Sequence, residues 1–152
     1  MDRIASFNID HRRLLPGLYL SRTDGGAATY DLRTRRPNTA ALMDNATMHS
    51  VEHLFATFIR NSALSERVLY FGPMGCQTGF YLIMRDTPQE AVIELVRETL
   101  QKIIAYDGAM PGASAEECGN FRNLSVEAAK KECRAYYETV RDIGVGDLIY
   151  AK

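Results

Sequence analysis

The sequence predicts an α+β domain of two layers, in which an antiparallel β-sheet carries helices on one face. Three observations predict it. Two short segments, 17–22 and 28–33, flank a glycine turn, as the strands of a hairpin do. Two later apolar runs are short enough to be strands, and the longer segments have helical apolar spacing. The resulting order is hairpin, helix, two strands, helix, helix, which fits an antiparallel sheet best.

The N-terminal residues show no regular pattern before the turn signal Pro16-Gly17. Thr23-Asp24-Gly25-Gly26 provides the glycines of the hairpin turn. Pro37-Asn38 stops any extension of the second strand, so Arg33 is expected near the end of that strand. The basic run around it, Arg33-Thr34-Arg35-Arg36, is interpreted as a solvated loop.

The middle of the chain is predicted to be a helix followed by two strands. From about Thr47 to Asn61 the apolar residues have the spacing of an amphipathic helix; they are Val51, Leu54, Phe55, Phe58 and Ile59. The apolar runs 68–71 and 79–84 are predicted to be strands, joined by a tight connection over 73–78.

Two further helices complete the prediction. Thr87-Pro88-Gln89-Glu90 has the pattern of a capping box, and the helix after it is expected to run to about Tyr106. A loop then leads to a last helix from about Ser125 to Arg141. Because no repeat or change of composition divides the chain, we expect a single domain over residues 1–152.

The composition is that of an ordinary globular protein, with 46% hydrophobic and 24% charged residues. The net charge of -1 gives no electrostatic reason to bind nucleic acid or an anionic membrane. No apolar run approaches the roughly 18 residues that span a bilayer, and the N-terminus lacks the apolar core of a signal peptide. Three cysteines do not suggest a disulfide framework. We therefore expect a reduced cytoplasmic protein.

The stretch MHSVEHLF places His49 and His53 four residues apart, with Glu52 just before the second. On a helix the two imidazoles share one face, and Glu52 can reach the same place. Two imidazoles suit a divalent metal, and a carboxylate suits proton transfer. H-x-x-E-H is also the inverse of the H-E-x-x-H metallopeptidase motif. Alone, the motif leaves open a metal site or two partly exposed histidines on a helix.

The three cysteines differ in their surroundings. Cys118 lies in a loop beside Gly119 and is the best candidate for a third ligand, with burial as a small hydrophobe as the alternative. Cys76 lies on a bend between Gly75 and Gln77, where a thiolate beside a metal would serve as a base; packing is again the alternative. Cys133 lies within the last predicted helix, where we expect it to pack in the core.

MHSVEHLF, GPMGCQTGFY and ECGN, in this order, resemble the S-ribosylhomocysteine lyase family (LuxS). Ser6-Phe7, Asp10-His11, and Asp31-Leu32-Arg33 followed by Pro37-Asn38 add further matches. The resemblance extends to about residue 135, and PMGCQTG together with H-x-x-E-H is specific. It implies a homodimer with two active sites near the subunit interface. It also implies one divalent metal per subunit, iron(II) in the native enzyme, which zinc or cobalt can replace.

Residue roles carried over from the family are the metal ligands His49, His53 and Cys118, the catalytic pair Cys76 and Glu52, and the substrate-binding residues Ser6, His11 and Arg33. The implied reaction cleaves the thioether of S-ribosylhomocysteine to homocysteine and 4,5-dihydroxy-2,3-pentanedione, the precursor of autoinducer-2. It would link the activated methyl cycle of methionine metabolism to quorum sensing. The metal acts as a Lewis acid, Cys76 moves the carbonyl along the sugar through an enediolate, and Glu52 assists the β-elimination.

The chain departs from the family pattern at several positions. Tyr70-Phe71-Gly72 stands where the family usually carries an aspartate, Thr34 replaces a phenylalanine, Arg36 a glutamine, and Pro16-Gly17 an A-P pair. These changes leave open a divergent lyase that acts on a related thioether. The residues also leave open an H-x-x-E-H metallopeptidase with a downstream glutamate ligand (Glu116, Glu117 or Glu127) and a non-catalytic metal-binding module.

Overall fold

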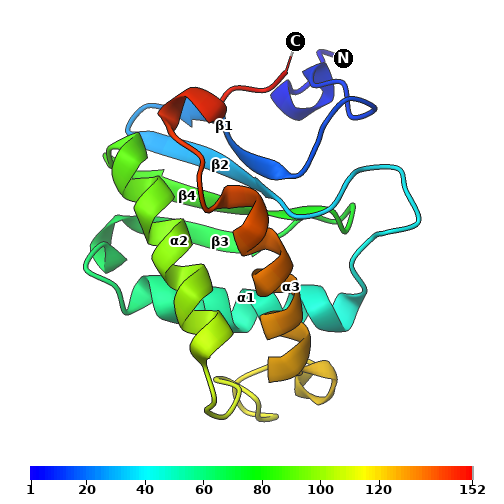
Figure 1. Cartoon of the computed structure of the whole chain (residues 1–152), viewed down its shortest axis with the longest axis vertical. Coiled ribbons are helices and arrows are strands. Elements are labelled where there is room, and N and C mark those ends of the chain that lie inside the picture. Colours follow the sequence, from blue (N-terminus) through cyan, green and yellow to red (C-terminus); the bar gives the residue numbers. More distant parts are fainter. Residues whose placement is uncertain (152) are drawn as a thin grey trace.

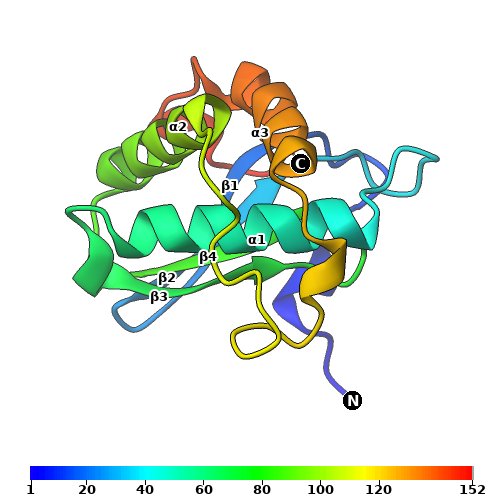
Figure 2. The same cartoon turned by 90° about the horizontal axis from the view of Figure 1, so that it is seen from below.

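The computed structural model describes residues 1–151, and its strands form one antiparallel sheet in the order β1-β2-β4-β3. The three α-helices pack on one face of this sheet, as Figures 1 and 2 show. The predicted α+β class is confirmed. The strands are β1 (Gly17–Asp24), β2 (Ala27–Arg33), β3 (Val68–Pro73) and β4 (Gly79–Arg85), and the helices are α1 (Asn45–Arg60), α2 (Gln89–Ala105) and α3 (Val126–Val140).

The hairpin of β1 and β2 forms as predicted, with Gly25 at a φ of 59° in its turn. β2 pairs with β4 from Ala27 opposite Arg85 to Arg33 opposite Gly79. Because side chains alternate along a strand, Tyr30 and Leu32 join the core under the helices, while Asp31 and Arg33 point to the other face. Arg33 is the last residue of β2, as expected.

Aromatic stacking fixes α1 over the edge of the sheet. The ring of Phe55 on α1 lies 4.3 Å from the ring of Phe71 on β3, and Phe71 lies 5.3 Å from Phe80 on β4, measured between centroids. All three side chains are buried in one hydrophobic cluster that also includes Cys133, whose predicted packing role is confirmed. The face of α1 that carries His49 and His53 is thereby turned away from the core, and both residues remain partly exposed.

Two of the three long helices begin at side-chain caps. Asp44 accepts a hydrogen bond from the backbone N–H of Thr47 (2.7 Å), and Ser125 accepts one from that of Ala128 (3.1 Å). The predicted capping box of α2 is wrong. Pro88 is the N-cap, with an extended ψ of 143°, and its carbonyl accepts from the N–H of Val92. The helix thus begins one residue later than the box requires, and the hydroxyl of Thr87 donates to the carbonyl of Arg85 instead.

The interpretation of the basic run as a solvated loop is also wrong for two of its arginines. Arg33 is 2% exposed, and Arg35 forms an ion pair with Glu132 of α3, with 2.6 Å between Nη2 and Oε2. Arg36 is exposed. The partner of Arg35 comes from a helix 97 residues later, so no local pattern indicates the pair. Within residues 1–151, no helix combines the length and apolar character required to span a bilayer.

Candidate metal centre and active site

His49 and His53 of α1 meet Cys118 from the loop between α2 and α3. One donor atom from each of the three side chains lies within 4.8 Å of the other two, and all three residues are partly buried. The imidazole rings lie edge to face, at 88° and with centroids 4.6 Å apart. The helix places the two histidines on one face, and the fold brings the cysteine to them.

Hydrogen bonds fix which ring nitrogens are free. Nδ1–H of His49 donates to Oδ1 of Asn123 (2.7 Å), and Nδ1–H of His53 donates to the carbonyl of Pro111 (2.8 Å). Because a neutral imidazole carries one proton, both Nε2 atoms keep a lone pair that can bind a metal.

The donor set fits a tetrahedral divalent metal. Sγ of Cys118 lies 3.3 Å from Nε2 of His49. Two such atoms bound to one zinc ion at ordinary bond lengths lie about 3.5 Å apart. The backbone N–H of Asn120 points at Sγ of Cys118 (3.4 Å) and would stabilise a metal-binding thiolate. Three protein ligands leave one coordination position for substrate, which is the arrangement of a catalytic site.

Cys76 lies on the turn between β3 and β4 and is exposed. The turn depends on Gln77, which adopts a positive φ of 65°. Backbone and side-chain hydrogen bonds join Gln77 to Met43, a buried residue in the loop before α1. These bonds hold the exposed thiol on a well-anchored backbone.

Cys76 is surrounded by hydrogen-bonding groups. Its Sγ lies 3.0 Å from Oγ1 of Thr78 and 3.8 Å from Nη1 of Arg33. Nη1 of Arg33 also donates to Oγ1 of Thr78 (2.6 Å). A guanidinium and a hydroxyl thus lie within reach of this sulfur as hydrogen-bond donors.

Arg33 is held by Asp31, two residues earlier on the same face of β2. Nη2 of Arg33 lies 2.6 Å from Oδ2 of Asp31, and both side chains are buried. The phenol of Tyr150 donates to the same Oδ2 (2.8 Å). Burial and the Asp31 carboxylate raise the pKa of Tyr150 well above its usual value. Burial opposes the charge of Arg33, but the Asp31 carboxylate outweighs it and raises the pKa of Arg33.

A pocket of about 540 Å³ collects the other predicted residues. Its lining includes Ser6, His11, Arg33 and Cys76. The first two come from the N-terminal segment, where Nδ1 of His11 binds the carbonyl of Ile9 (2.9 Å). None of the three candidate metal ligands lines this pocket. Glu52 lies on α1 with the histidines and is partly exposed. The predicted residues therefore fall into two groups, one around the candidate metal ligands and one around Cys76.

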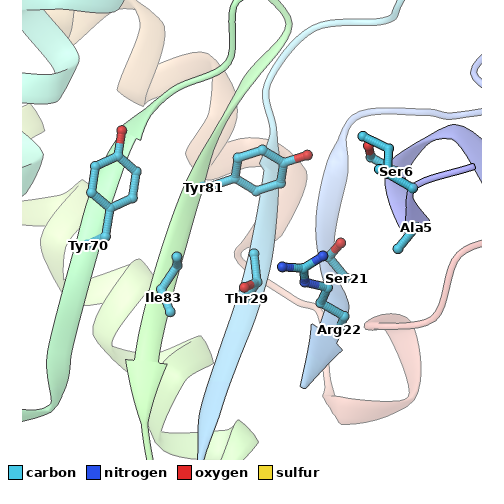
Figure 3. Close-up of a pocket in the computed structure, with 9 residues that line it drawn as sticks. Ala5, Ser6, Ser21, Arg22, Thr29, Tyr70, Tyr81 and Ile83 are labelled. Carbon is cyan, nitrogen blue, oxygen red and sulfur yellow. The ribbon is translucent and has the colours of Figure 1, made fainter. Parts of the chain in front are cut away.

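The sheet face opposite the helices carries a further hollow of about 250 Å³, which Figure 3 shows. Tyr70 and Tyr81 border it, and Ser6, from the N-terminal segment of the chain, also lines it. A side chain at Gly72 would meet the phenol of Tyr70, 2.1 Å from an added Cβ. Within the stretch that lacks the family aspartate, the phenol of Tyr70 thus occupies the space that Gly72 leaves.

Sequence reasoning missed three groups beside these residues: Asp31, Thr78 and Asn123. Asp31 and Thr78 each lie two positions from a predicted site residue, and that spacing on a strand or turn is a signal that could have identified them. Asn123 lies 74 residues from its partner His49, and no local pattern indicates that contact.

Comparison with known proteins agrees with this geometry. The family model for S-Ribosylhomocysteinase (LuxS) matches residues 4–144. An S-ribosylhomocysteine lyase from Finegoldia magna is 43% identical over 99% of both chains. Another from Desulfotalea psychrophila is 45% identical over 93% of both, and one from Borreliella burgdorferi is 39% identical over 99% of both. A match over nearly the whole chain, in which the three candidate ligands lie together, shows that this chain belongs to the S-ribosylhomocysteinase (LuxS) family.

Proposed function

We propose that this chain, a carbon–sulfur lyase by its family, cleaves S-ribosylhomocysteine with the two groups of residues described above. The products are homocysteine and 4,5-dihydroxy-2,3-pentanedione, the precursor of autoinducer-2. The observation that carries the proposal is the convergence of His49, His53 and Cys118, because the first two are adjacent on one helix but the third comes from a distant loop. We also infer that the chain acts as one metal-dependent domain in the cytoplasm.

His49, His53 and Cys118 would hold one divalent metal through two Nε2 atoms and one thiolate. We infer iron(II) as the native ion, which zinc or cobalt can replace. Bound there, the metal would act as a Lewis acid that polarises the sugar carbonyl of the opened substrate.

Cys76 is the proposed general base. Its thiolate removes the proton from the carbon next to the carbonyl and returns it to the former carbonyl carbon, while the hydroxyl proton passes to the former carbonyl oxygen. Together these two transfers move the carbonyl one position along the sugar. A second transfer moves the carbonyl again. Arg33 and Thr78 support this role because both place polar groups within hydrogen-bonding distance of Sγ of Cys76. Glu52 then accepts the proton whose loss expels the homocysteine thiolate.

Ser6, His11 and Arg33 are the proposed substrate-binding residues. They line the same pocket as Cys76 and offer a hydroxyl, an imidazole and a guanidinium to the hydroxyl groups of the ribose. Tyr70, at the nearby open face of the sheet, is where a related thioether would be distinguished, because the family aspartate is missing there. Turnover of such a thioether in preference to S-ribosylhomocysteine would favour the divergent lyase.

We propose that two copies of the chain pair through the open face of the sheet. This face carries exposed apolar side chains, with Phe7 61% exposed and Tyr70 49% exposed. Pairing across a two-fold axis would bring the Cys76 pocket of one copy against the metal ligands of the other. This arrangement explains why a reaction that needs both groups can occur in a fold whose Cys76 pocket contains none of the metal ligands.

The test is release of free thiol from S-ribosylhomocysteine, followed with a chromogenic disulfide reagent. We expect Cys76→Ala and Glu52→Gln to retain one metal per chain and lose turnover, because they remove proton transfer alone. His49→Ala should lose the metal itself. Cys133→Ala, at a buried cysteine outside the site, is the matched control and should keep turnover.

A Cys76→Ala variant at the full rate would contradict the role given to Cys76. Cleavage of peptides by the wild-type protein would favour the metallopeptidase, and metal binding without thiol release would favour a binding module.

A further inference from the structure

The two candidate histidine ligands are held by different kinds of partner. Nδ1–H of His53 donates to the backbone carbonyl of Pro111, a group that no side-chain substitution removes. Nδ1–H of His49 donates to the side chain of Asn123, at 2.7 Å. The orientation of His49 thus depends on one replaceable side chain.

The amide of Asn123 is itself held in one orientation. Its Nδ2 donates to Oδ1 of Asn45, the first residue of α1, at 2.6 Å. The amide oxygen is therefore left facing His49. If the amide turned over, its NH₂ group would face the Nδ1–H of His49 and its oxygen would face the oxygen of Asn45, so both hydrogen bonds would be lost.

The backbone beside Asn123 is anchored to the helix that carries the ligands. Ser50, which follows His49, is fully buried, and its Oγ accepts from the backbone N–H of Ser125 (2.8 Å). Ser125 in turn caps α3 through its own hydroxyl. Asn123, two residues before Ser125, is thus presented to His49 from a fixed position, and α1, the loop and α3 all contribute to it.

We infer that Asn123, aligned by Asn45, is a positioning residue that directs the Nε2 lone pair of His49 toward the metal and strengthens metal binding. The inference rests on the proposed ligand role of His49, His53 and Cys118. It also distinguishes the two histidines, because substitution can weaken the hold on His49 while the backbone bond of His53 remains.

The experiment measures the Zn²⁺ affinity of the full chain by competition with a chromophoric chelator. Asn123→Leu removes the acceptor at nearly constant volume, and we expect about 10- to 100-fold weaker binding. Asn123→Asp keeps an oxygen acceptor for Nδ1–H and should bind Zn²⁺ within about threefold of the wild type. Asn61→Leu is the matched control, since Asn61 lies at the far end of α1 and donates to the carbonyl of Thr57. It should not change the affinity.

Asn45 tests whether the effect passes through Asn123. We expect Asn45→Ala to weaken binding less than Asn123→Leu, and Asn45→Asp to restore it, because the carboxylate still accepts from Nδ2. The double variant Asn45→Ala/Asn123→Leu should bind no more weakly than Asn123→Leu alone, because Asn45 has no other route to His49 in this relay.

A second measurement does not depend on affinity. In the Zn²⁺-loaded protein, the Nδ1 proton of His49 should give a slowly exchanging NMR signal in the wild type and in Asn123→Asp. We expect Asn123→Leu to lose this signal and to retain that of His53. A purely structural role for Asn123 would change both signals or neither.

Zn²⁺ binding by Asn123→Leu within about twofold of the wild type would overturn the inference. Equal losses for Asn123→Asp and Asn123→Leu would also overturn it. Should Asn123→Leu fail to fold, the exposed Asn45 carries the test, and wild-type affinity of Asn45→Ala would contradict the relay. A wild-type chain that does not bind Zn²⁺ would instead contradict the proposed ligand set.

Discussion

Nη1 of Arg33 lies 3.8 Å from Sγ of Cys76, at the end of a buried chain of charges that begins at Asp31. The same nitrogen donates to the hydroxyl of Thr78, which also lies within hydrogen-bonding distance of the sulfur. A cation and a hydroxyl thus converge on a thiol that is itself exposed. The fold brings these groups together through the register of β2 against β4 and the turn that precedes β4.

Thr78→Val should slow alkylation of Cys76 by iodoacetamide at neutral pH. The substitution keeps the shape of the side chain and removes a hydrogen bond to the sulfur, and the loss of one hydrogen bond corresponds to about a two- to tenfold change in rate. Alkylation is followed by mass spectrometry of the Cys76 peptide in Zn²⁺-loaded protein. Thr78→Ser keeps the hydroxyl and should react like the wild type; if it is as slow as the valine variant, the hydroxyl is not the cause.

Asp31→Asn should destabilise the folded protein by about 3–5 kcal/mol, because it leaves the buried guanidinium of Arg33 without a countercharge. The free energy of unfolding in urea measures the loss. The exposed pair of Arg141 and Glu138 provides the comparison, with side chains 51% and 61% exposed. Glu138→Gln should change stability by less than about 0.5 kcal/mol. Similar losses at both sites would contradict the distinction.

Stability should fall as the pH rises from about 10 into the alkaline range, above the ordinary pKa of tyrosine. Burial raises the pKa of Tyr136 and of Tyr150, so unfolded chains release phenolic protons that folded chains retain. Tyr150→Phe should be less stable than the wild type at pH 8, where it lacks the hydrogen bond to Asp31, and this deficit should shrink at pH 11.5. A constant deficit in urea unfolding at both pH values would contradict the assignment.

Mixing two inactive variants should restore activity if the site forms between subunits. His49→Ala lacks a metal ligand and Cys76→Ala lacks the base, so a mixed dimer has one intact site. With random exchange of subunits, about half of the dimers are mixed, and each of these has one intact site of two. The mixture then has about a quarter of the wild-type activity. His49→Ala mixed with His53→Ala should recover nothing, because both changes affect the same group. Recovery of activity in that control would contradict a site shared between subunits. The absence of activity in the first mixture would contradict it as well.

Ser125→Ala should destabilise the protein by about 1 kcal/mol, because Ser125 caps α3. Thr87→Ala should cost less than about 0.5 kcal/mol, because the Thr87 hydroxyl does not cap α2. Thermal unfolding of the two variants, read by circular dichroism, makes the comparison. A larger loss of stability for Thr87→Ala would indicate that Thr87 does cap α2, as the sequence pattern predicts.

Much of the fold follows from patterns within single segments. The glycine turn, the apolar spacing of α1 and the short apolar runs of β3 and β4 each predict an element that forms within a few residues of its expected ends. The pairing of His49, Glu52 and His53 on one helix is likewise local, because residues three and four apart share a face. The capping box of α2 fails since a sequence pattern does not fix whether Pro88 joins the helix or precedes it.

The sequence by itself determined the elements, because these depend on spacing along a few turns of chain, and its motifs carry the resemblance to the family from which the candidate site residues were taken. Only the tertiary structure decided which distant groups meet: Asn123 with His49, Tyr150 with Asp31, and Glu132 with Arg35. These partners are 74, 119 and 97 residues apart. Such contacts arise because the hydrophobic core packs the helices on the sheet. No short stretch of the chain specifies which distant residues this packing brings together.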